Sequence, residues 1–550
     1  MSDTPAESSA VLDDQAQLHR MGYAQELFRS MGGFQNFAIS FTIISILAGC
    51  LTSYAIAFNQ GGPVAITWGW LLVGLMCTFV ALALGEIAST YPTAGGLYFW
   101  SSKLGSPGWG WFTGWFNLIG QIAVTAAIGF GCAIFMVSLL NLLWNFPNTY
   151  HWIYFVYGLI MLGAGIINMF KVSITAALNA FSAWWHMIGV LVIVGVLIAV
   201  PDHHRSIGYV FGQTINNTGF GGGTTHGIVF FYVFLTGLLM AQYTITGYDA
   251  SAHMSEETRS ASIGAAWGMV MSVVVSVVFG FLLLVAVTFV VPSDSAAASA
   301  GTFIIQYVWA TATSTHWAEF MLFIAVVAQV FCTIASTTSA SRMMFAFSRD
   351  GAVPGHRVWR KVSKRDRIPV NTVWAIVVLS FLTPLPALWW GYVGYAASTA
   401  VAVIGLYIAF VLPIILRLRA GESFERGAWH LGKHYKWIDW IAILWIVFIC
   451  FVFILPTFKG GIPFESGFSW LIFNYTPLMI GGAFVLFGGW YLVSGRKWFK
   501  GPIRQGSDEE LRQIEAGFES PGTPATAPAG QAEQSVERRA GIVPARLRLS

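Results

Sequence analysis

Residues 41–58 read FTIISILAGCLTSYAIAF, a stretch long and apolar enough to form a helix that crosses a lipid bilayer. Its middle, from Ser45 to Ser53, is rich in poor helix formers where a simple anchor would carry Leu and Val. A second apolar stretch, residues 228–254, is interrupted in the same way by QYTITGYD at residues 242–249. Lipid cannot hydrogen-bond freed backbone groups, so such interruptions must face a cavity or other protein. Together they predict the binding site of a transporter.

The composition is that of a polytopic membrane protein. Of the 550 residues, 56% are hydrophobic and 10% are charged, whereas a soluble domain carries about a quarter charged residues. Windows of about 20 apolar residues predict an all-α polytopic membrane protein with twelve transmembrane helices. The predicted spans are residues 38–58, 64–88, 111–143, 152–169, 174–200, 228–254, 264–291, 318–346, 373–390, 394–416, 438–456 and 475–494.

The basic residues predict how the chain is oriented. With the N-terminus in the cytoplasm, every Lys and Arg except Arg205 and Lys459 falls in a cytoplasmic segment. The positive-inside rule therefore predicts a multi-pass protein of the cell membrane with both termini in the cytoplasm. The net charge of +4 reflects this orientation in the lipid bilayer and does not indicate nucleic-acid binding.

Three parts follow from the pattern. Residues 1–33 are predicted to form a polar cytoplasmic arm, and residues 34–500 the twelve-span transporter domain. Residues 501–550 are rich in Pro, Ala, Gly and charge, which predicts a disordered cytoplasmic tail. All five cysteines fall within predicted spans, so we expect no disulfide framework and no metal site. Without a phosphate-binding glycine motif, we expect no nucleotide or other cofactor.

Ionisable residues inside the spans are candidates for function because burying a charge is costly. Asp249 directly follows the second interruption, and His186 is the ionisable residue of the fifth span. The alternatives are a structural partner for helix-break amides at Asp249 and a hydrogen-bonded core histidine at His186. Glu86 lies near the cytoplasmic end of the second span, where an anchor or a gate explains it better than substrate contact.

A cluster of charges follows the eighth span. Arg342, Arg349 and Asp350 lie in the segment ASRMMFAFSRDGAVP, residues 340–354, at a cytoplasmic helix end. One interpretation is a gate closed by salt bridges. The other is a set of solvated charges at the end of a helix, and the sequence leaves both open.

Several segments resemble the amino acid–polyamine–organocation superfamily. They are EIASTYPTAGGLYFW at residues 86–100, the interrupted sixth span through Glu256, Glu257 and Thr258, and residues 341–354. RGAWHLGK at residues 426–433 and NYTP at 474–477 resemble the amino acid/choline transporter family, which contains GABA, choline and polyamine permeases. The resemblance covers residues 22–500. It implies the LeuT-type fold, a five-plus-five inverted repeat with two extra helices, and the interruptions are five spans apart as that repeat requires.

The resemblance also implies that substrate binds between the first, third, sixth, eighth and tenth spans, with its carboxylate at the first interruption and its ammonium at the second. The residues implied for a substrate carboxylate are Ser45, Ala48, Gly49, Cys50 and Thr52. Those implied for the substrate ammonium are Tyr243, Thr244, Ile245 and Thr246, and Gly247 completes the predicted substrate-binding set. The partial charges at helix ends agree with this assignment. Tyr243 would act as an aromatic gate and offer a cation–π contact, or it is an ordinary packing aromatic.

The coupling ion stays open between proton and sodium. In some proton-coupled relatives a Lys on the fifth span replaces a sodium ion, and His186 approximates that position and titrates near neutral pH. Sodium would use carbonyls near residues 45–48 and hydroxyls of the eighth span such as Ser336 and Thr337, which could equally serve helix packing. Further cavity candidates are Ser398 and Thr399 of the tenth span and Asn117 and Gln121 of the third span.

We therefore predict a secondary active transporter, and not an enzyme, that imports an amino acid or a related small amine such as GABA by alternating access. A choline or polyamine permease is the alternative, although the sparse acids of the spans disfavour a polyamine. A nutrient sensor that binds without transport would need signalling appendages, and here the tails are short. A membrane-embedded enzyme would need clustered His, Asp and Glu on one membrane face.

Overall fold

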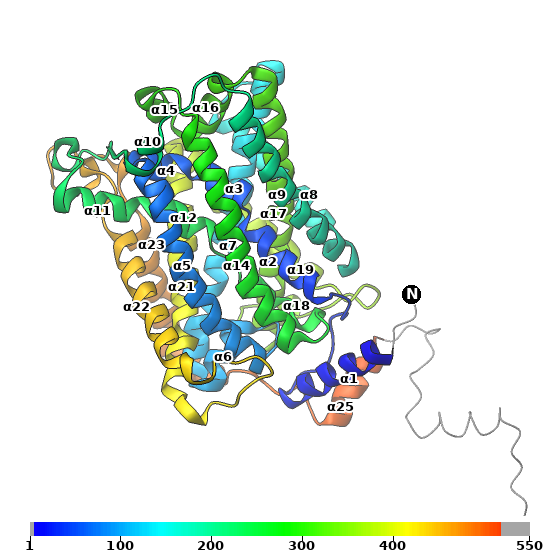
Figure 1. Cartoon of the computed structure of the whole chain (residues 1–550). Coiled ribbons are helices and arrows are strands. Elements are labelled where there is room, and N and C mark those ends of the chain that lie inside the picture. The colour runs from blue at the N-terminus through cyan, green and yellow to red at the C-terminus, as the bar shows by residue number, and fades with distance from the viewer. Residues whose placement is uncertain (1–4, 519–550) are drawn as a thin grey trace, which may run out of the picture.

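The computed structural model describes residues 5–518. Within them, twelve helical stretches are long and apolar enough to cross a membrane, as predicted. They stand side by side in one tall bundle (Figure 1). In chain order they are α2 (Gly33–Ile44) with α3 (Ile46–Thr52), α5 (Pro63–Thr90), α7 (Pro107–Trp144), α8 (Tyr150–Ile167), α9 (Val172–Ala199), α11 (Gly227–Gly237) with α12 (Leu239–Thr244), α14 (Ala261–Phe289), α17 (Thr315–Arg349), α19 (Val370–Leu382) with α20 (Ala387–Trp390), α21 (Tyr392–Ala420), α22 (Tyr435–Ile454) and α23 (Thr476–Trp490).

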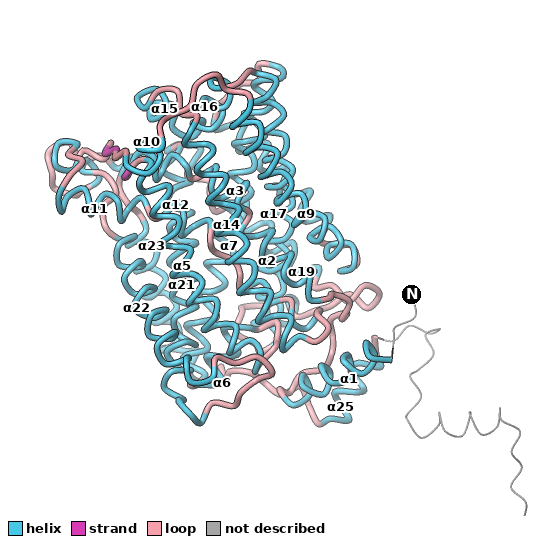
Figure 2. Tube along the Cα trace, viewed as in Figure 1, coloured by secondary structure: helices cyan, strands magenta, loops and turns pink. Residues whose placement is uncertain are grey.

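Short elements and loops gather at the two ends of the bundle (Figure 2). The short helices are α1 (Pro5–Arg20), α4 (Tyr54–Asn59), α6 (Gly96–Leu104), α10 (Ile207–Gly212), α13 (Ala250–His253), α15 (Asp294–Ala300), α16 (Ile304–Ala312), α18 (His356–Trp359), α24 (Arg496–Trp498) and α25 (Asp508–Ala516), with the 3₁₀ turn η2 (Ser255–Glu257). The strands β1 (Gln60–Gly61) and β2 (Ile215–Asn216) form a small antiparallel pair.

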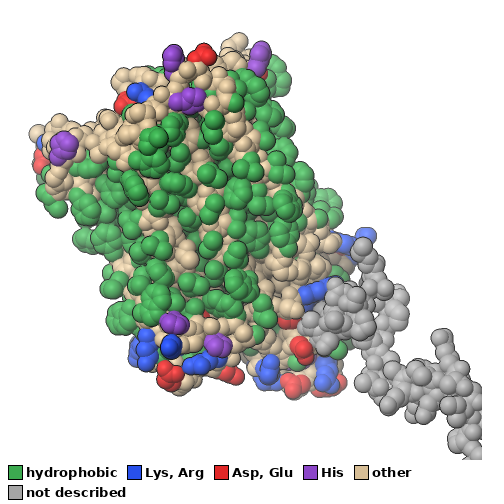
Figure 3. Space-filling model, in the orientation of Figure 1, with side chains coloured by type: hydrophobic (Ala, Val, Ile, Leu, Met, Phe, Trp, Pro, Cys, Tyr) green, Lys and Arg blue, Asp and Glu red, His purple; other side chains and the backbone are tan. Residues whose placement is uncertain are grey.

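The surface explains why these helices belong in a bilayer. On the face that Figure 3 shows, apolar side chains cover the middle of the bundle, while Lys and Arg gather with acids at the end that carries α1, α6 and α25, here called the basic end. Large apolar side chains such as Leu191 of α9 and Leu444 of α22 are 53% and 61% exposed on the outside. A continuous apolar surface of this kind is an interaction surface, and lipid is the partner that fits a belt around twelve spans.

Both predicted interruptions are present, and they lie against each other. Ser45 adopts the left-handed conformation, with φ 38° and ψ 79°, and separates α2 from α3. In the sixth span α12 ends at Thr244, and Gly247, with φ 92°, precedes α13. Helix α3 contacts α12, and α2 contacts α13. The two broken spans are therefore antiparallel, as an inverted repeat requires.

The end of the described chain corrects one prediction. Residues 501–518 were expected to be disordered, yet α25 forms there behind a capping box made by Ser507 and Glu510. Glu515 holds it to the N-terminal arm, with Oε1 2.7 Å from both His19 Nε2 and the backbone amide of Gln25. The sequence pattern misses this helix because polar contacts fix it, with Leu511 as its buried apolar residue. Residues 519–550 of the predicted tail lie outside the described residues.

Candidate functional site

The centre of the candidate site is the contact between α3 and α12. A Cβ atom on Gly49 would lie 2.6 Å from Thr244 Oγ1 and 2.8 Å from Thr244 Cα. A Cβ atom on Gly247 would collide with Ile43 of α2. Real Cβ atoms do not approach that closely, so the two broken spans can meet only because these positions are glycine.

The residues implied for a carboxylate lie together along α3 and are buried. The amides of Ala48 and Gly49 both donate to the Ser45 carbonyl at 2.8 Å. The Thr52 hydroxyl donates to the Ala48 carbonyl at 2.8 Å. Cys50 lies on the same short helix. In this closed arrangement the backbone groups are used within the helix, and their contact with substrate stays a prediction.

The residues implied for an ammonium surround the end of α12. The hydroxyls of Thr244 and Thr246 donate to carbonyls one turn back in the chain, at 2.7 and 2.8 Å. The Ile245 carbonyl accepts from the Tyr407 hydroxyl of α21 at 3.2 Å. These contacts place the break at the interface of α12 with α21.

Tyr243 is buried at the same level, 5% exposed. Its hydroxyl interacts with Tyr395 of α21 and with Cys332 of α17, two residues that were not predicted from the sequence. An aromatic side chain held between two other spans has the position of a gate over the centre. Its contact with substrate stays a prediction.

His186 lies against the first interruption, as the comparison with proton-coupled relatives implied. Its Nε2 is 2.7 Å from Ser45 Oγ and its Nδ1 is 2.8 Å from the Ser182 carbonyl oxygen. A neutral imidazole satisfies both contacts, because Nδ1–H donates to the carbonyl while Nε2 accepts from the hydroxyl.

The hydroxyls proposed as sodium ligands have other partners. Ser336 Oγ lies 2.6 Å from Thr125 Oγ1 of α7, and the Thr337 hydroxyl donates to a carbonyl of its own helix at 2.8 Å. Toward the first break α17 instead presents Cys332, whose Sγ lies 3.2 Å from the Ile43 carbonyl oxygen. These contacts support helix packing, and a sodium site at Ser336 and Thr337 stays a prediction.

Asp249 is the acceptor at the middle of a buried polar cluster. Its Oδ2 accepts from Gln121 Nε2 at 2.9 Å and lies 3.5 Å from Asn117 Nδ2 and 3.3 Å from His253 Nε2. All four residues are at most 2% exposed. The structure thus brings together three residues selected from the sequence and adds His253. The signal for His253 was its spacing, because residues four apart share a helix face.

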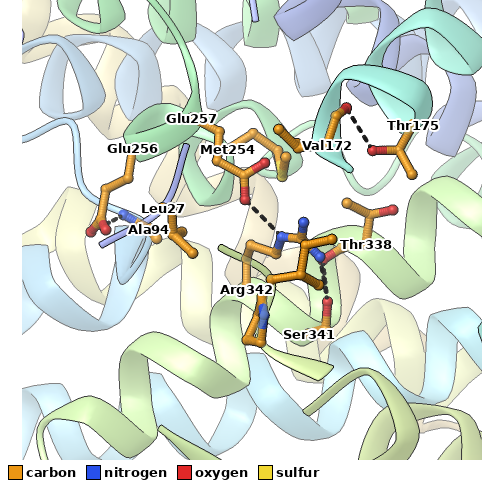
Figure 4. A network of polar contacts seen from close by, with 12 residues as sticks. Leu27, Ala94, Val172, Thr175, Met254, Glu256, Glu257, Thr338, Ser341 and Arg342 are labelled. Atoms are coloured by element: carbon orange, nitrogen blue, oxygen red, sulfur yellow. Dashed lines mark hydrogen bonds and ion pairs between the residues drawn. The ribbon is translucent and has the colours of Figure 1, made fainter. Parts of the chain in front are cut away.

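Two ion pairs close the basic end. Arg342 Nε of α17 donates to Glu257 Oε1 at 2.8 Å, and Arg349 Nη2 donates to Glu256 Oε1 at 2.9 Å. Figure 4 shows Glu257 pointing toward Arg342 while Glu256 points away, toward the amide of Ala94. Burial raises the pKa of Glu257, and Arg342 opposes that rise. The predicted salt bridges are therefore present and buried, so Arg342 and Arg349 are not solvated charges. Their role as a gate stays a prediction.

Segments outside the first and last spans add a second layer of contacts over these ion pairs. Asp350 Oδ2 accepts from the hydroxyls of Tyr23 and Tyr98 at 2.8 and 2.7 Å, and its Oδ1 accepts from the Ile503 amide at 2.9 Å. Burial raises the pKa of Asp350, while Arg349 opposes that rise. Segments before the first span and after the last one therefore meet at the end of α17.

The opposite end of the bundle is hollowed. A cavity of 450 Å³ there is lined by α4 and the segment around Thr302, and a smaller one of 150 Å³ reaches Leu239 of α12. Ile56 and Gln60 line both cavities.

The basic end has a cavity of its own, of 810 Å³, lined by α1, α6 and residues 425–428. What separates the helix breaks from that end is therefore the pair of buried ion pairs, Arg342–Glu257 and Arg349–Glu256.

Glu86 belongs to a different site. Its Oε2 accepts from Arg417 Nε at 2.8 Å, and its Oε1 accepts from the Leu431 amide at 3.0 Å. The Arg417 guanidinium also lies 4.0 Å from the ring centres of Phe424 and Tyr435. Glu86 thus ties the basic end of α21 to the segment after it, as an anchor would.

Replacing Glu86 with Gln is expected to lower stability and leave substrate affinity unchanged. Breaking a buried ion pair costs about 3–5 kcal/mol. Thermal unfolding in detergent and the half-saturating substrate concentration measure the two effects. Glu422, 69% exposed and paired with Arg426, gives a matched control, because Glu422→Gln removes a surface pair worth about 1 kcal/mol or less. A raised half-saturating concentration in Glu86→Gln with unchanged stability would contradict the anchor.

Comparison with known proteins decides the family. The family described as amino acid permease matches residues 31–484. The chain belongs to the amino acid permease family. The permease is 38% identical over 509 residues to the amino-acid permease BAT1 of Arabidopsis thaliana, covering 89% of this chain and 96% of the relative. It is 37% identical over 510 residues to the BAT1 homolog of Oryza sativa, covering 89% and 95%.

A more distant relative carries a substrate in its name. The GABA-specific permease of Saccharomyces cerevisiae is 26% identical over 519 residues, which cover 91% of this chain and 88% of the relative. Family membership makes this protein a multi-pass membrane transporter of amino acids and not an enzyme. The predicted superfamily and all-α fold are confirmed.

Proposed function

We propose that this permease imports an amino acid or a related small amine such as GABA by alternating access, with the substrate bound between the two helix breaks. The observation that carries this proposal is the contact of Gly49 with Thr244, where two antiparallel broken spans meet. Freed backbone groups at membrane depth need a polar partner. A substrate with both a carboxylate and an ammonium group supplies one to each break.

The closed basic end gives the direction of the cycle. Substrate enters from the end opposite the basic end, past Ile56 and Gln60, and reaches Tyr243 at the centre of the site. Release at the basic end requires that Arg342–Glu257 and Arg349–Glu256 separate. We place the basic end and both termini in the cytoplasm, because the positive-inside rule favours that orientation. The cell membrane is the proposed location.

Coupling to an ion would drive uptake against a gradient. A proton or a sodium ion is the candidate. His186, whose Nε2 lies 2.7 Å from Ser45 Oγ, and the buried Asp249 are the candidate residues for this coupling. GABA is proposed as a substrate because a relative of similar length is named for it.

Uptake by purified protein in proteoliposomes tests the proposal. The labelled panel holds GABA, neutral, basic and acidic amino acids, choline and putrescine, with an inward proton gradient, an inward sodium gradient or neither. We expect uptake of at least one amino acid or GABA, increased by one of the gradients. Uptake of choline or putrescine alone would contradict a site that binds a carboxylate at one break and an ammonium at the other. Saturable binding without uptake of any compound would favour a sensor.

Truncating the aromatic gate should weaken binding. Tyr243→Ala is expected to raise the half-saturating concentration, because a cation–π contact of about 0.5–2 kcal/mol is lost. Tyr243→Phe keeps the ring and should change the concentration much less. Equal effects of the two changes would assign the role to the hydroxyl beside Tyr395 instead.

A further inference from the structure

A buried acid–base pair lies between the centre of the site and the closed basic end. Asp249 and His253 are both 0% exposed, and His253 Nε2 lies 3.3 Å from Asp249 Oδ2. The other ring nitrogen, Nδ1, lies 2.9 Å from the carbonyl oxygen of Ala94. The Ala94 amide in turn donates to Glu256 Oε1 at 3.0 Å, and Glu256 is paired with Arg349. The pair is thus linked through the backbone of a single residue, Ala94, to the Arg349–Glu256 ion pair of the basic end.

The contacts of His253 fix how many protons the pair holds. A carbonyl oxygen only accepts, so Nδ1 carries a hydrogen that it donates to Ala94. Nε2 faces Asp249 Oδ2. A second proton between them gives either imidazolium with carboxylate or imidazole with carboxylic acid, and both forms are neutral overall. Removing that proton leaves a net negative charge in a buried site, which is strongly unfavourable.

The groups around the pair do not offset the negative charge that loss of this proton would leave. From α7, Gln121 and Asn117 donate amide hydrogens, which are neutral. Of the titratable groups around it, Tyr248 is bonded to the Tyr407 hydroxyl at 3.4 Å, and Glu256 is neutralised by Arg349. From the remaining side, the backbone of Gly96 packs on the imidazole. A Cβ atom added to Gly96 would lie 3.2 Å from His253 Cε1.

An independent observation shows that the cluster is incomplete in the closed state. Within residues 5–518, Asp249 Oδ1 and Asn117 Oδ1 are buried without a hydrogen-bond partner. Buried polar atoms in proteins are almost always bonded, and exceptions often mark a functional group. Because one of its oxygens has no donor, the Asp249 carboxylate is poorly compensated for its burial, which favours the form in which a proton is shared between its Oδ2 and His253 Nε2.

We propose that Asp249 and His253 form the proton-binding site of this permease, which rests on the proposed uptake function. The proton is shared between Asp249 Oδ2 and His253 Nε2 while the basic end is closed. It leaves from His253 into the cytoplasm when the ion pairs separate and water reaches the imidazole. His186 differs, because its partners are a hydroxyl and a carbonyl that a neutral ring already satisfies.

Two assays on Asp249→Asn and His253→Gln test the site, both with an amino acid that the wild type transports. One measures accumulation and acidification of the lumen under an inward proton gradient, followed with an entrapped pH dye. The other measures counterflow of the labelled amino acid without a gradient. We expect both variants to lose accumulation and acidification and to keep counterflow. If the His186→Gln variant retains counterflow, proteoliposomes that contain it should still show acidification of the lumen. Asp439→Asn, which alters a buried carboxyl of α22, should behave as the wild type.

The outcomes separate this proposal from the function itself. Accumulation and acidification that persist in both variants would overturn the proton site. Loss of counterflow in both inserted variants would also overturn it, because the pair would then serve binding or structure. Absence of counterflow by the wild type for every amino acid would instead contradict the proposed function.

Discussion

Replacing Gly49 with Leu is expected to abolish uptake while the protein still inserts in the membrane. The new Cβ would lie 2.6–2.8 Å from Thr244 atoms that include its Cα, so the backbone itself would have to move. Overpacking costs about 1–3 kcal/mol, which a domain of twelve spans can tolerate. A displacement of about 1 Å at a binding site, however, can cost on the order of 100-fold in rate. Uptake in proteoliposomes, normalised to inserted protein, measures the effect.

Gly247→Leu should have the same result for two reasons. The position has φ 92°, which L-residues rarely adopt, and its Cβ would collide with Ile43. Gly195 of α9 is the matched control, because its Cβ would meet nothing within 4 Å. Gly195→Leu should insert and transport normally. If Gly49→Leu and Gly247→Leu also transported normally, the binding site between the breaks would be refuted.

The spans and both helix breaks could be predicted from the sequence because each depends on local composition. Long apolar runs define the spans, and clusters of Gly, Ser and Thr inside two of them define the interruptions. Arg342 and Arg349 were also visible as charges at a helix end. Their partners, Glu257 and Glu256, lie 85 and 93 residues away in the chain, and only the fold brings them into contact.

The rest of the site depends on tertiary contacts that no local pattern encodes. Tyr395 is one aromatic among many until α21 places it beside Tyr243. His253 stands four residues after Asp249, which is a local signal. Its role as the proton partner of Asp249, however, depends on the Ala94 carbonyl, which fixes its tautomer. Helix α25 is the opposite case, since it has a capping box but almost no apolar face. A search for hydrophobic periodicity therefore passes over it.

Exchanging the charges of Arg342 and Glu257 should recover much of what either single reversal destroys. The Arg342–Glu257 pair is 1% exposed on both sides, so Arg342→Glu or Glu257→Arg buries two like charges in contact. Losing a buried pair costs about 3–5 kcal/mol. We expect both single variants to unfold at lower temperature and to lose uptake, because the basic end no longer closes.

The double variant restores opposite charges at the same two positions, and its recovery separates a gate contact from two unrelated defects. The exchange leaves the backbone contact intact, since Ser30 and Met31 donate to the Glu257 carbonyl and not to its side chain. We expect an interaction energy on the order of 1–3 kcal/mol from the four unfolding transitions, with partial return of uptake. The same cycle on Arg426 and Glu422, 48% and 69% exposed, should give less, about 0.3–0.5 kcal/mol. Additive losses in the Arg342 and Glu257 cycle would mean that the pair does not hold the basic end closed.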